Sequence, residues 1–340
     1  MGIDGCVLKG MDNIFYLTGF RGSEGTLFVT RGDVVLIVDF RYITHAREVT
    51  SGIYVHETNP GSDALYDLCT KYKVSQLGFD GVHVPYATYL TLSESLPGIN
   101  LVPMNSGIEE IRKNKEPGEI ELIRDAISIA ERAFGDIAGL VRPGAAEKDI
   151  ADEFDHMMRK HGAQGPSFNT IVASGPHAAM PHAEPGEKKI KAGETVILDF
   201  GAISSGYSSD ETVTLCIGEI PDKLAEIYTI VDDARKLGIE KAIAGISIQQ
   251  LDSIVRGYIE EKGYGDYFRH GVGHGVGIAV HEPPSVNSSA KGILEENMVI
   301  TIEPGIYLPN IGGVRLEDMV LITRDTPRIL TRIRKDMIKI

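Results

Sequence analysis

Hydrophobic and polar positions follow two different periods in the first hundred residues. Two apolar runs, TLFVT at 26–30 and VVLIVDF at 34–40, flank an Arg-Gly-Asp turn at 31–33 and predict a β-hairpin. Apolar residues then recur at helical spacing from near Tyr42 and again over about 62–72. This part of the chain therefore predicts a small domain of alternating strands and helices.

A change of period marks a domain boundary. Pro, Gly and Asn are frequent between 97 and 118, and from Pro117 apolar residues recur at long helical spacing. Proline suits the first turn of such a helix. We therefore predict an N-terminal domain of residues 1–112 and a C-terminal domain of residues 113–340.

The C-terminal domain shows an internal repeat. A second helix is predicted over about 146–161, and two further helices over about 222–244 and 247–262, with strand patterns after each pair. Over 117–335 this predicts two related halves, whose strands pack into one curved antiparallel sheet with helices outside and a cleft between the halves. Three residue pairs share an offset of 101 residues, namely Gly144 with Gly245, Ile150 with Leu251, and Gly162 with Gly263.

Two aspartates lie in strand patterns of the first half. Asp199 in VILDFGA and Asp210 in SSDETVT are joined by a turn, and a hairpin centred on Ser204-Ser205 would place them directly opposite. Cross-strand partners share one face, with Cβ atoms about 5 Å apart. Two carboxylates so close repel unless a proton or a divalent cation lies between them. Aspartate is depleted in strands, so this pair favours a cation site over two unrelated strand residues.

The second half repeats the arrangement with glutamates. Glu303 in VITIEPG and Glu317 in GVRLEDM flank a turn, and a hairpin centred near Asn310 would place them face to face. The alternative for Glu317 is a solvent-exposed strand position. Arg315 lies two residues before Glu317 on the same face, where it could steady a carboxylate or bind a substrate oxygen.

Histidines complete the set of candidate ligands. The segment RHGVGHGVGIAVHEPP contains His270, His274 and His281 among alternating glycines, which allow close backbone approach. A further cluster, GPHAAMPHAEP, carries His177 and His182. Four carboxylates with an imidazole form an oxygen-rich site, where Mn²⁺, Co²⁺ or Fe²⁺ fits as well as Zn²⁺. That much negative charge is balanced better by two divalent ions about 3.5–4 Å apart than by one.

Composition narrows the function classes. The net charge of −14 argues against nucleic acid and against an anionic membrane surface as partners, and indicates either solubility alone or partly a cation site. No apolar run reaches the ~18 residues of a membrane span, and the first residues lack a signal-peptide pattern. The three cysteines, Cys6, Cys69 and Cys216, are widely spaced without a CxxC, so we expect a reducing, cytoplasmic setting.

Together these segments resemble the M24 "pita-bread" metallopeptidases, and within them the Xaa-Pro aminopeptidases and prolidases. The motifs MPHAEP, ILDFGA, YSSDET, HGVGHGVGIAVHEPP, TIEPGIY and GGVRLED occur in the family's order over 177–318. Residues 13–47 resemble the family's N-terminal domain, which methionine aminopeptidases generally lack. The resemblance implies a mixed α/β (α+β) protein, with a small N-terminal α/β domain and a pita-bread (creatinase/aminopeptidase-like) domain built on a pseudo-twofold curved sheet.

The resemblance also implies a dinuclear metal site and the roles of its residues. Glu303 would handle the proton of the attacking water, His182 and His281 would bind substrate and shuttle protons, His270 would line the same pocket, and Arg315 would support it. The implied activity is hydrolysis of the Xaa-Pro bond of a proline-containing peptide. The enzyme is expected to be a cytoplasmic homodimer with two divalent ions, with Mn²⁺ or Co²⁺ preferred and Zn²⁺ or Fe²⁺ as alternatives. The implied metal ligands are Asp199, Asp210, His274, Glu303 and Glu317, with Asp210 and Glu317 bridging the ions.

Two departures and three alternatives accompany the resemblance. The family usually reads Ser-Asp-Xaa-Thr-Arg-Thr where this chain has Val213, and it normally has a helix before the first strand, so we expect either that the helix is absent or that the start lies upstream. Release of the first residue from longer peptides is the main hypothesis, and a prolidase restricted to Xaa-Pro dipeptides is the alternative. A non-catalytic peptide-binding module and a creatinase-like amidinohydrolase are less favoured, because such relatives do not keep the metal ligands.

Overall fold

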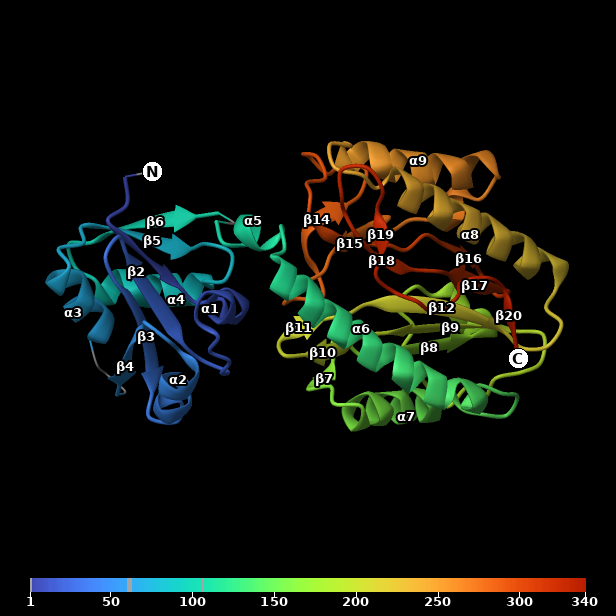
Figure 1. Ribbon diagram of the computed structural model, residues 1–340, viewed down its shortest axis with the longest axis horizontal. Helices are drawn as coiled ribbons and strands as arrows, with labels where there is room; N and C mark the ends of the chain where they lie inside the picture. The colour runs from blue at the N-terminus through green and yellow to red at the C-terminus, as the bar shows by residue number, and fades with distance from the viewer. Residues whose placement is uncertain (1, 60–62, 106) are drawn as a thin grey trace. The chain divides into compact units, whose positions relative to one another are not determined.

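A computed structural model describes residues 2–59, 63–105 and 107–340. The chain divides after Arg112 into two compact units of mixed α/β structure (Figure 1). The smaller unit ends at that residue, and the larger unit, residues 113–340, contains every candidate ligand identified above.

The smaller unit is built on a six-stranded mixed sheet in the order β4-β3-β2-β1-β5-β6. Strands β2 and β3 form the predicted antiparallel hairpin around residues 31–33. The predicted helix near 62–72 is confirmed from Ala64 onward, whereas its first expected residue lies outside the described part. Side chains alternate between two hydrophobic clusters, Phe28 in one and Leu27 in the other, so both faces of the sheet are covered. The elements are β1 (Gly5–Leu8), α1 (Met11–Thr18), β2 (Thr26–Thr30), β3 (Val34–Asp39), α2 (Ile43–Val49), β4 (Tyr54–Thr58), α3 (Ala64–Lys71), β5 (Gln76–Asp80), α4 (Tyr86–Ser95), β6 (Asn100–Met104) and α5 (Glu109–Arg112).

Four long helices frame the larger unit, two from each half of the predicted repeat. The first begins at Pro117 behind a capping box, in which Glu116 and Glu119 satisfy each other's backbone amides. The helices predicted over 146–161 and 247–262 are confirmed within one residue at each end. The helix predicted over 222–244 ends earlier, at Lys241. The helices are α6 (Pro117–Ile137), α7 (Glu147–Lys160), α8 (Asp222–Lys241) and α9 (Ile248–Glu261), with short 3₁₀ turns η1 (Ala138–Leu140), η2 (Gly175–Ala179) and η3 (Gly265–Tyr267).

The strands of the larger unit lie between these helix pairs. Figure 1 shows α6 and α7 on one side of the strands and α8 and α9 on the other. Two hydrophobic clusters correspond to this layering, one beneath α6 and α7 and one beneath α8 and α9. The strands are β7 (Gly165–Pro166), β8 (Ile171–Ser174), β9 (Thr195–Phe200), β10 (Ala202–Ser204), β11 (Tyr207–Ser208), β12 (Glu211–Cys216), β13 (Gly273–Gly275), β14 (Glu282–Val286), β15 (Val299–Ile302), β16 (Gly305–Leu308), β17 (Gly312–Arg315), β18 (Asp318–Leu321), β19 (Arg328–Ile329) and β20 (Ile338–Lys339).

The hairpin of the first half turns one residue later than predicted. Its central residues are Ser205 and Gly206, both with positive φ, as a two-residue type I′ turn requires. The expected centre at Ser204-Ser205 was therefore wrong, because glycine is favoured at the second turn position. The direct partner of Asp199 is Thr212, and Asp210 precedes that strand. The shift moves each partner by two positions, which preserves the shared face.

The hairpin of the second half turns where the sequence predicts. Gly305 pairs with Arg315 on one side of the glutamates, and Ile302 pairs with Asp318 on the other. Both pairs are symmetric about Asn310, so Glu303 and Glu317 face each other between the two ladders. The predicted centre near Asn310 is therefore confirmed.

Strands of the two halves meet at a seam. The curved sheet consists of separate ladders and not of one uninterrupted ladder, with β12-β9-β8 from the first half and β13-β15-β18 from the second. At the seam the backbone amide of Glu317 donates to the carbonyl of Thr212 at 3.1 Å. This bond brings together the segments that carry Asp210, which precedes β12, and Glu317, which precedes β18, one candidate ligand from each half.

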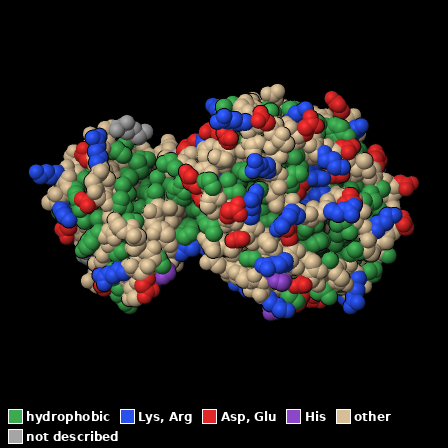
Figure 2. Space-filling view, in the orientation of Figure 1, with side chains coloured by type: hydrophobic (Ala, Val, Ile, Leu, Met, Phe, Trp, Pro, Cys, Tyr) green, Lys and Arg blue, Asp and Glu red, His purple; other side chains and the backbone are tan. Residues whose placement is uncertain are grey.

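Two observations concern the membrane and nucleic-acid partners considered above, namely the hydropathy of the helices and the charge of the surface. In the part of the chain that the structure describes, no helix is both long and apolar enough to cross a membrane. Figure 2 shows acidic and basic side chains interspersed over the visible face of the larger unit.

Candidate metal and substrate site

One cavity of about 500 Å³ brings the candidate residues of both halves together. It lies within the larger unit, in the volume range of small-molecule sites. Its wall also includes Phe168, Asn169, Ser285 and Asn287, which the sequence analysis did not identify. All nine predicted site residues line it, namely His182, Asp199, Asp210, His270, His274, His281, Glu303, Arg315 and Glu317.

Carboxylates from three strand ends meet at the floor of this cavity. Oxygen atoms of Asp199, Asp210 and Glu317 all lie within 4.8 Å of one another, and so do ligand atoms of His274, Glu303 and Glu317. Asp210 and Glu317 are buried, at 5% and 2% exposure. The hydroxyl of Thr212 donates to Glu317 Oε2 at 2.6 Å, which fixes the orientation of that carboxylate.

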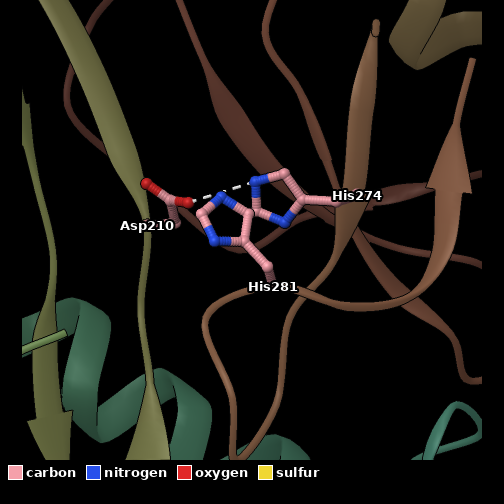
Figure 3. A group of neighbouring side chains, drawn as sticks. All are labelled: Asp210, His274 and His281. Carbon is pink, nitrogen blue, oxygen red and sulfur yellow. Dashed lines mark ion pairs between the residues drawn. The ribbon is translucent and has the colours of Figure 1, made fainter. Parts of the chain in front are cut away.

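His274 faces two of these carboxylates through one nitrogen of its ring. Its Nδ1 lies 3.1 Å from the carbonyl oxygen of Gly275, which can only accept, so Nδ1 carries the proton. Its Nε2 lies 3.4 Å from Asp210 Oδ2 and 3.3 Å from Glu303 Oε1. Figure 3 shows Asp210 and His274 reaching toward each other from different segments of the chain, with His281 beside them. A ring nitrogen this close to two carboxylates can bind a divalent cation together with them.

The charges of the site are unbalanced without a cation. Asp199 Oδ1 and Glu317 Oε1 are buried and have no hydrogen-bond donor among the described residues. Burial, then the neighbouring carboxylates, raise the pKa of Asp210 and of Glu317 well above their usual values. Burial also raises the pKa of Glu303, although His274 and Arg315 oppose this. Orphaned buried oxygens in a set of four carboxylates and one imidazole fit divalent metal ions.

Arg315 supports the site from one side. Its Nη2 donates to Asp199 Oδ2 at 2.6 Å, and its Nη1 donates to the hydroxyl of Tyr307 at 3.0 Å. The Tyr307 hydroxyl in turn lies 2.9 Å from His270 Nε2, while His270 Nδ1 faces the carbonyl of Gly271. Burial, and then the charge of Arg315, lower the pKa of His270 to about 4. His270 is therefore neutral at pH 7, and its Nε2 accepts a hydrogen bond from the hydroxyl of Tyr307.

The remaining histidines differ in exposure and partners. His182 and His281 are exposed at the wall of the cavity, where a bound molecule could reach them. Partial desolvation, and then the neighbouring His274, lower the pKa of His281. His177 does not line the cavity; its Nδ1 lies 2.9 Å from Glu147, a fully buried residue of α7.

The glycines around His274 serve close packing, as expected from the sequence. A Cβ atom on Gly273 would clash with the carbonyl of Thr301, and one on Gly275 with the carbonyl of Pro283. Strand β13 is therefore held directly against its neighbours, which places His274 beside Glu303.

Sequence reasoning missed three residues that contact the candidate site residues. Thr212 and Thr301 lie two positions from Asp210 and Glu303, and strand alternation could have placed them on the same face. Thr301 Oγ1 donates to Glu303 Oε1 at 3.2 Å and accepts from the backbone amide of His274. Tyr307 follows Glu303 by four positions across the break at Pro304, and no periodicity would have indicated it.

Comparisons with family models match most of the chain. The model of metallopeptidase family M24 matches residues 121–324, and the model of the creatinase/prolidase N-terminal domain matches residues 1–113.

Similar proteins include a sequence relative and two solved structures. An uncharacterized peptidase, YqhT, of Bacillus subtilis is 39% identical over 340 residues, covering 99% of this chain and 96% of the relative. An Xaa-Pro dipeptidase from Bacillus anthracis is similar with a TM-score of 0.96 and 37% identity, covering 100% of this chain and 96% of that one. An X-Pro aminopeptidase from Thermotoga maritima is similar with a TM-score of 0.93 and 34% identity, covering 100% of this chain and 98% of that one. The predicted fold, a creatinase-like N-terminal domain and a pita-bread C-terminal domain, is thereby confirmed.

Proposed function

Since this chain belongs to metallopeptidase family M24, we propose that it is an aminopeptidase that releases the first residue of peptides by hydrolysing the Xaa-Pro bond. We assign catalysis to residues 113–340, and we assign to residues 1–112 the role of a creatinase/prolidase-like N-terminal domain. The observation that carries the proposal is the single cavity in which all nine predicted residues meet.

The proposed metal ligands are those that share the cavity floor. Two divalent ions bound there would lower the pKa of a water molecule and polarise the substrate carbonyl. Mn²⁺ or Co²⁺ suits the oxygen-rich ligand set, with Zn²⁺ and Fe²⁺ as alternatives. The residues that would hold the ions are Asp199, Asp210, His274, Glu303 and Glu317, and the family resemblance implies that Asp210 and Glu317 would be shared between them.

The protein's own groups would move protons and hold the substrate. Glu303, whose pKa is raised by burial, would accept the proton of the attacking water and pass it to the leaving proline nitrogen. His281 and His182, exposed in the cavity, donate hydrogen bonds to the carbonyl oxygen as negative charge develops there. His270 and Arg315 line the substrate pocket, and the hydroxyl of Tyr307 hydrogen-bonds to both side chains and so fixes their positions.

We favour longer peptides over dipeptides as substrates because of the charge of the cavity wall. Among the described residues that line it, Arg315 is the one permanent cation, and it is paired with Asp199. Ser285 and Asn287 contribute neutral polar groups. The cavity wall therefore offers no unpaired arginine or lysine to hold the carboxylate of a dipeptide, which supports an aminopeptidase over a prolidase. The substrate is a proline-containing peptide, and we propose a homodimer.

A peptide-length series tests the proposal. Protein treated with chelator and then reloaded with Mn²⁺ or Co²⁺ should cleave Arg-Pro-Pro faster than Gly-Pro, and Asp210→Ala should lose cleavage. Asp325→Ala, an exposed control outside the cavity, should retain it. Cleavage of Gly-Pro alone would establish the prolidase instead, and wild-type protein that cleaves neither peptide in any metal would refute the peptidase assignment.

A further inference from the structure

Each proposed bridging ligand is followed in the chain by a second buried acid. Glu211 follows Asp210 and Asp318 follows Glu317, and these two residues are 1% and 2% exposed. Because side chains alternate along a strand, both point away from the cavity, and neither lines it. The proposed function gives these acids no role.

A single lysine from the C-terminal segment connects the two acids. Lys335 is 4% exposed, and its Nζ forms an ion pair with Glu211 and lies 3.6 Å from Asp318 Oδ1. One acid belongs to each half of the larger unit, so the ammonium group spans the seam directly behind Asp210 and Glu317.

The two acids depend on this lysine to different degrees. Asp318 also pairs with Arg235 of α8 and accepts a hydrogen bond from the hydroxyl of Thr331 at 2.6 Å. Glu211 depends on Lys335 more strongly. Among the described residues, Lys335 is the cation paired with Glu211, and Oε2 of Glu211 has no hydrogen-bond donor. The next residue on the same strand face, Val213, is buried and apolar, so the strand itself brings no cation.

The lysine is held in a defined place. Its Nζ also donates to the carbonyl of Ile333 at 3.1 Å, and the hydroxyl of Tyr228 lies 3.3 Å from the carbonyl of Lys335. Beyond it, β20 pairs in parallel with β12, with Ile338 opposite Leu215. The C-terminal segment thus docks on the strand that follows Asp210.

We propose that Lys335 is a positioning residue that holds Asp210 and Glu317 at the separation required to bind two metal ions. The inference rests on the proposed metal site. Without Lys335, the contact that joins Glu211 of one half to Asp318 of the other would be lost directly behind the metal site. Asp318 would keep Arg235, but Glu211 would be left buried without its partner, which is destabilising, so the strands at the seam would be held together less firmly.

Metal-binding measurements on a small set of variants test this role. Lys335→Met should weaken binding of Mn²⁺ and Co²⁺ about tenfold or more by calorimetry, and should change the visible spectrum of the Co²⁺ form. The double variant Lys335→Met/Glu211→Gln, which removes both members of the pair, should recover most of the affinity. Lys339→Met, which removes an exposed pair with Glu219 on the same segment, is the control and should bind like wild type.

Reciprocal linkage supplies a measurement that needs no variant. If Lys335 aids metal binding, metal must tighten the C-terminal segment, so hydrogen exchange of residues 331–340 in the wild-type protein should slow when Mn²⁺ is added. Unchanged exchange would overturn the proposal, as would Lys335→Met protein that binds both ions with wild-type affinity and an unchanged Co²⁺ spectrum. Wild-type protein that binds no metal would instead refute the proposed function.

Discussion

At the scale of single residues, hydroxyl groups next to the candidate ligands orient them. Thr212 and Thr301 each contact one carboxylate on the cavity floor. Such supporting hydrogen bonds hold a ligand in its binding orientation before the ion arrives, which lowers the cost of binding.

Replacing Thr212 by valine should weaken metal binding while the fold persists. Valine has a similar shape but lacks the hydroxyl. It would remove the hydrogen bond that Thr212 donates to Glu317 Oε2 at 2.6 Å and the one that it accepts from Arg315 Nε at 3.3 Å. We expect the affinity for Mn²⁺ to fall about tenfold or more, measured by calorimetry. Thr229→Val, at an exposed position of α8, is the matched control. Equal affinities in both variants would show that the hydroxyl does not support the site.

His270 should make stability depend on pH in a predictable direction. Its pKa is about 4 in the folded protein, against about 6.5 when unfolded, so the folded state favours the neutral ring. The stability gained from this is present above pH 6.5 and is lost as pH falls toward 4. Urea unfolding of metal-free protein should show wild type losing up to about 3 kcal/mol between pH 7 and 4 relative to His270→Gln. A constant difference across that range would contradict the neutral assignment.

The sequence indicated residues whose chemistry is unusual for their place. Paired acids in apolar strands and clustered histidines pointed to the cavity wall, and Asp199, Asp210, Glu303 and Glu317 all lie there. Tyr307 and Lys335 could not be found in this way. A tyrosine or a lysine is ordinary in its local pattern, and only the fold brings each to its partners from a distant part of the chain.

At the scale of secondary-structure elements, turn geometry decided what the sequence could predict. Strand alternation was enough to predict that Asp199 and Asp210 share a face, but the register depended on which residues take positive φ. Ser205 and Gly206 do so, and the ladder shifted accordingly. Around Asn310, itself at positive φ, the predicted centre was correct because strands of matching length flank it.

The segment between β8 and β9 carries His182 and is fixed at two points. At its base, Glu147 accepts hydrogen bonds from the amide and hydroxyl of Ser174 and pairs with His177. Farther along, Arg315 Nη1 donates to the carbonyl of Pro181 at 3.1 Å. The base therefore sets where this wall of the cavity lies.

Weakening the base should impair catalysis but not metal binding. Glu147→Gln keeps an acceptor for Ser174 but removes the charge opposite His177, so His182 would be less well placed. We expect kcat/KM for Arg-Pro-Pro to fall several-fold with unchanged Mn²⁺ affinity, because no proposed ligand lies in this segment. Glu187→Ala, which removes an exposed pair with Lys148 of the same helix, should have no effect. Loss of metal affinity in Glu147→Gln would mean that the segment supports the metal site instead.

At the scale of the whole molecule, the repeat explains why the site lies at a seam. Each half supplies one hairpin with two acids, and neither half alone has enough ligands for two ions. The seam bond between Glu317 and Thr212 and the buried Lys335 tie the halves together. The helix pairs and strand pairs of this repeat could be predicted from periodicity. The closing contacts could not, since they join residues more than a hundred positions apart.

The larger unit should fold and bind metal by itself. All five proposed ligands, their supporting residues and two hydrophobic clusters lie within residues 113–340. A unit of this size buries enough apolar surface to be stable alone. We therefore expect this fragment to unfold cooperatively by circular dichroism and to gain thermal stability when Mn²⁺ or Co²⁺ is added, because an ion that binds only the folded state stabilises it. The same fragment with Asp210→Ala should unfold cooperatively without that gain. A fragment that folds but shows no metal-dependent shift would place part of the binding determinants in residues 1–112, and the assignment of the site to the larger unit would then be wrong.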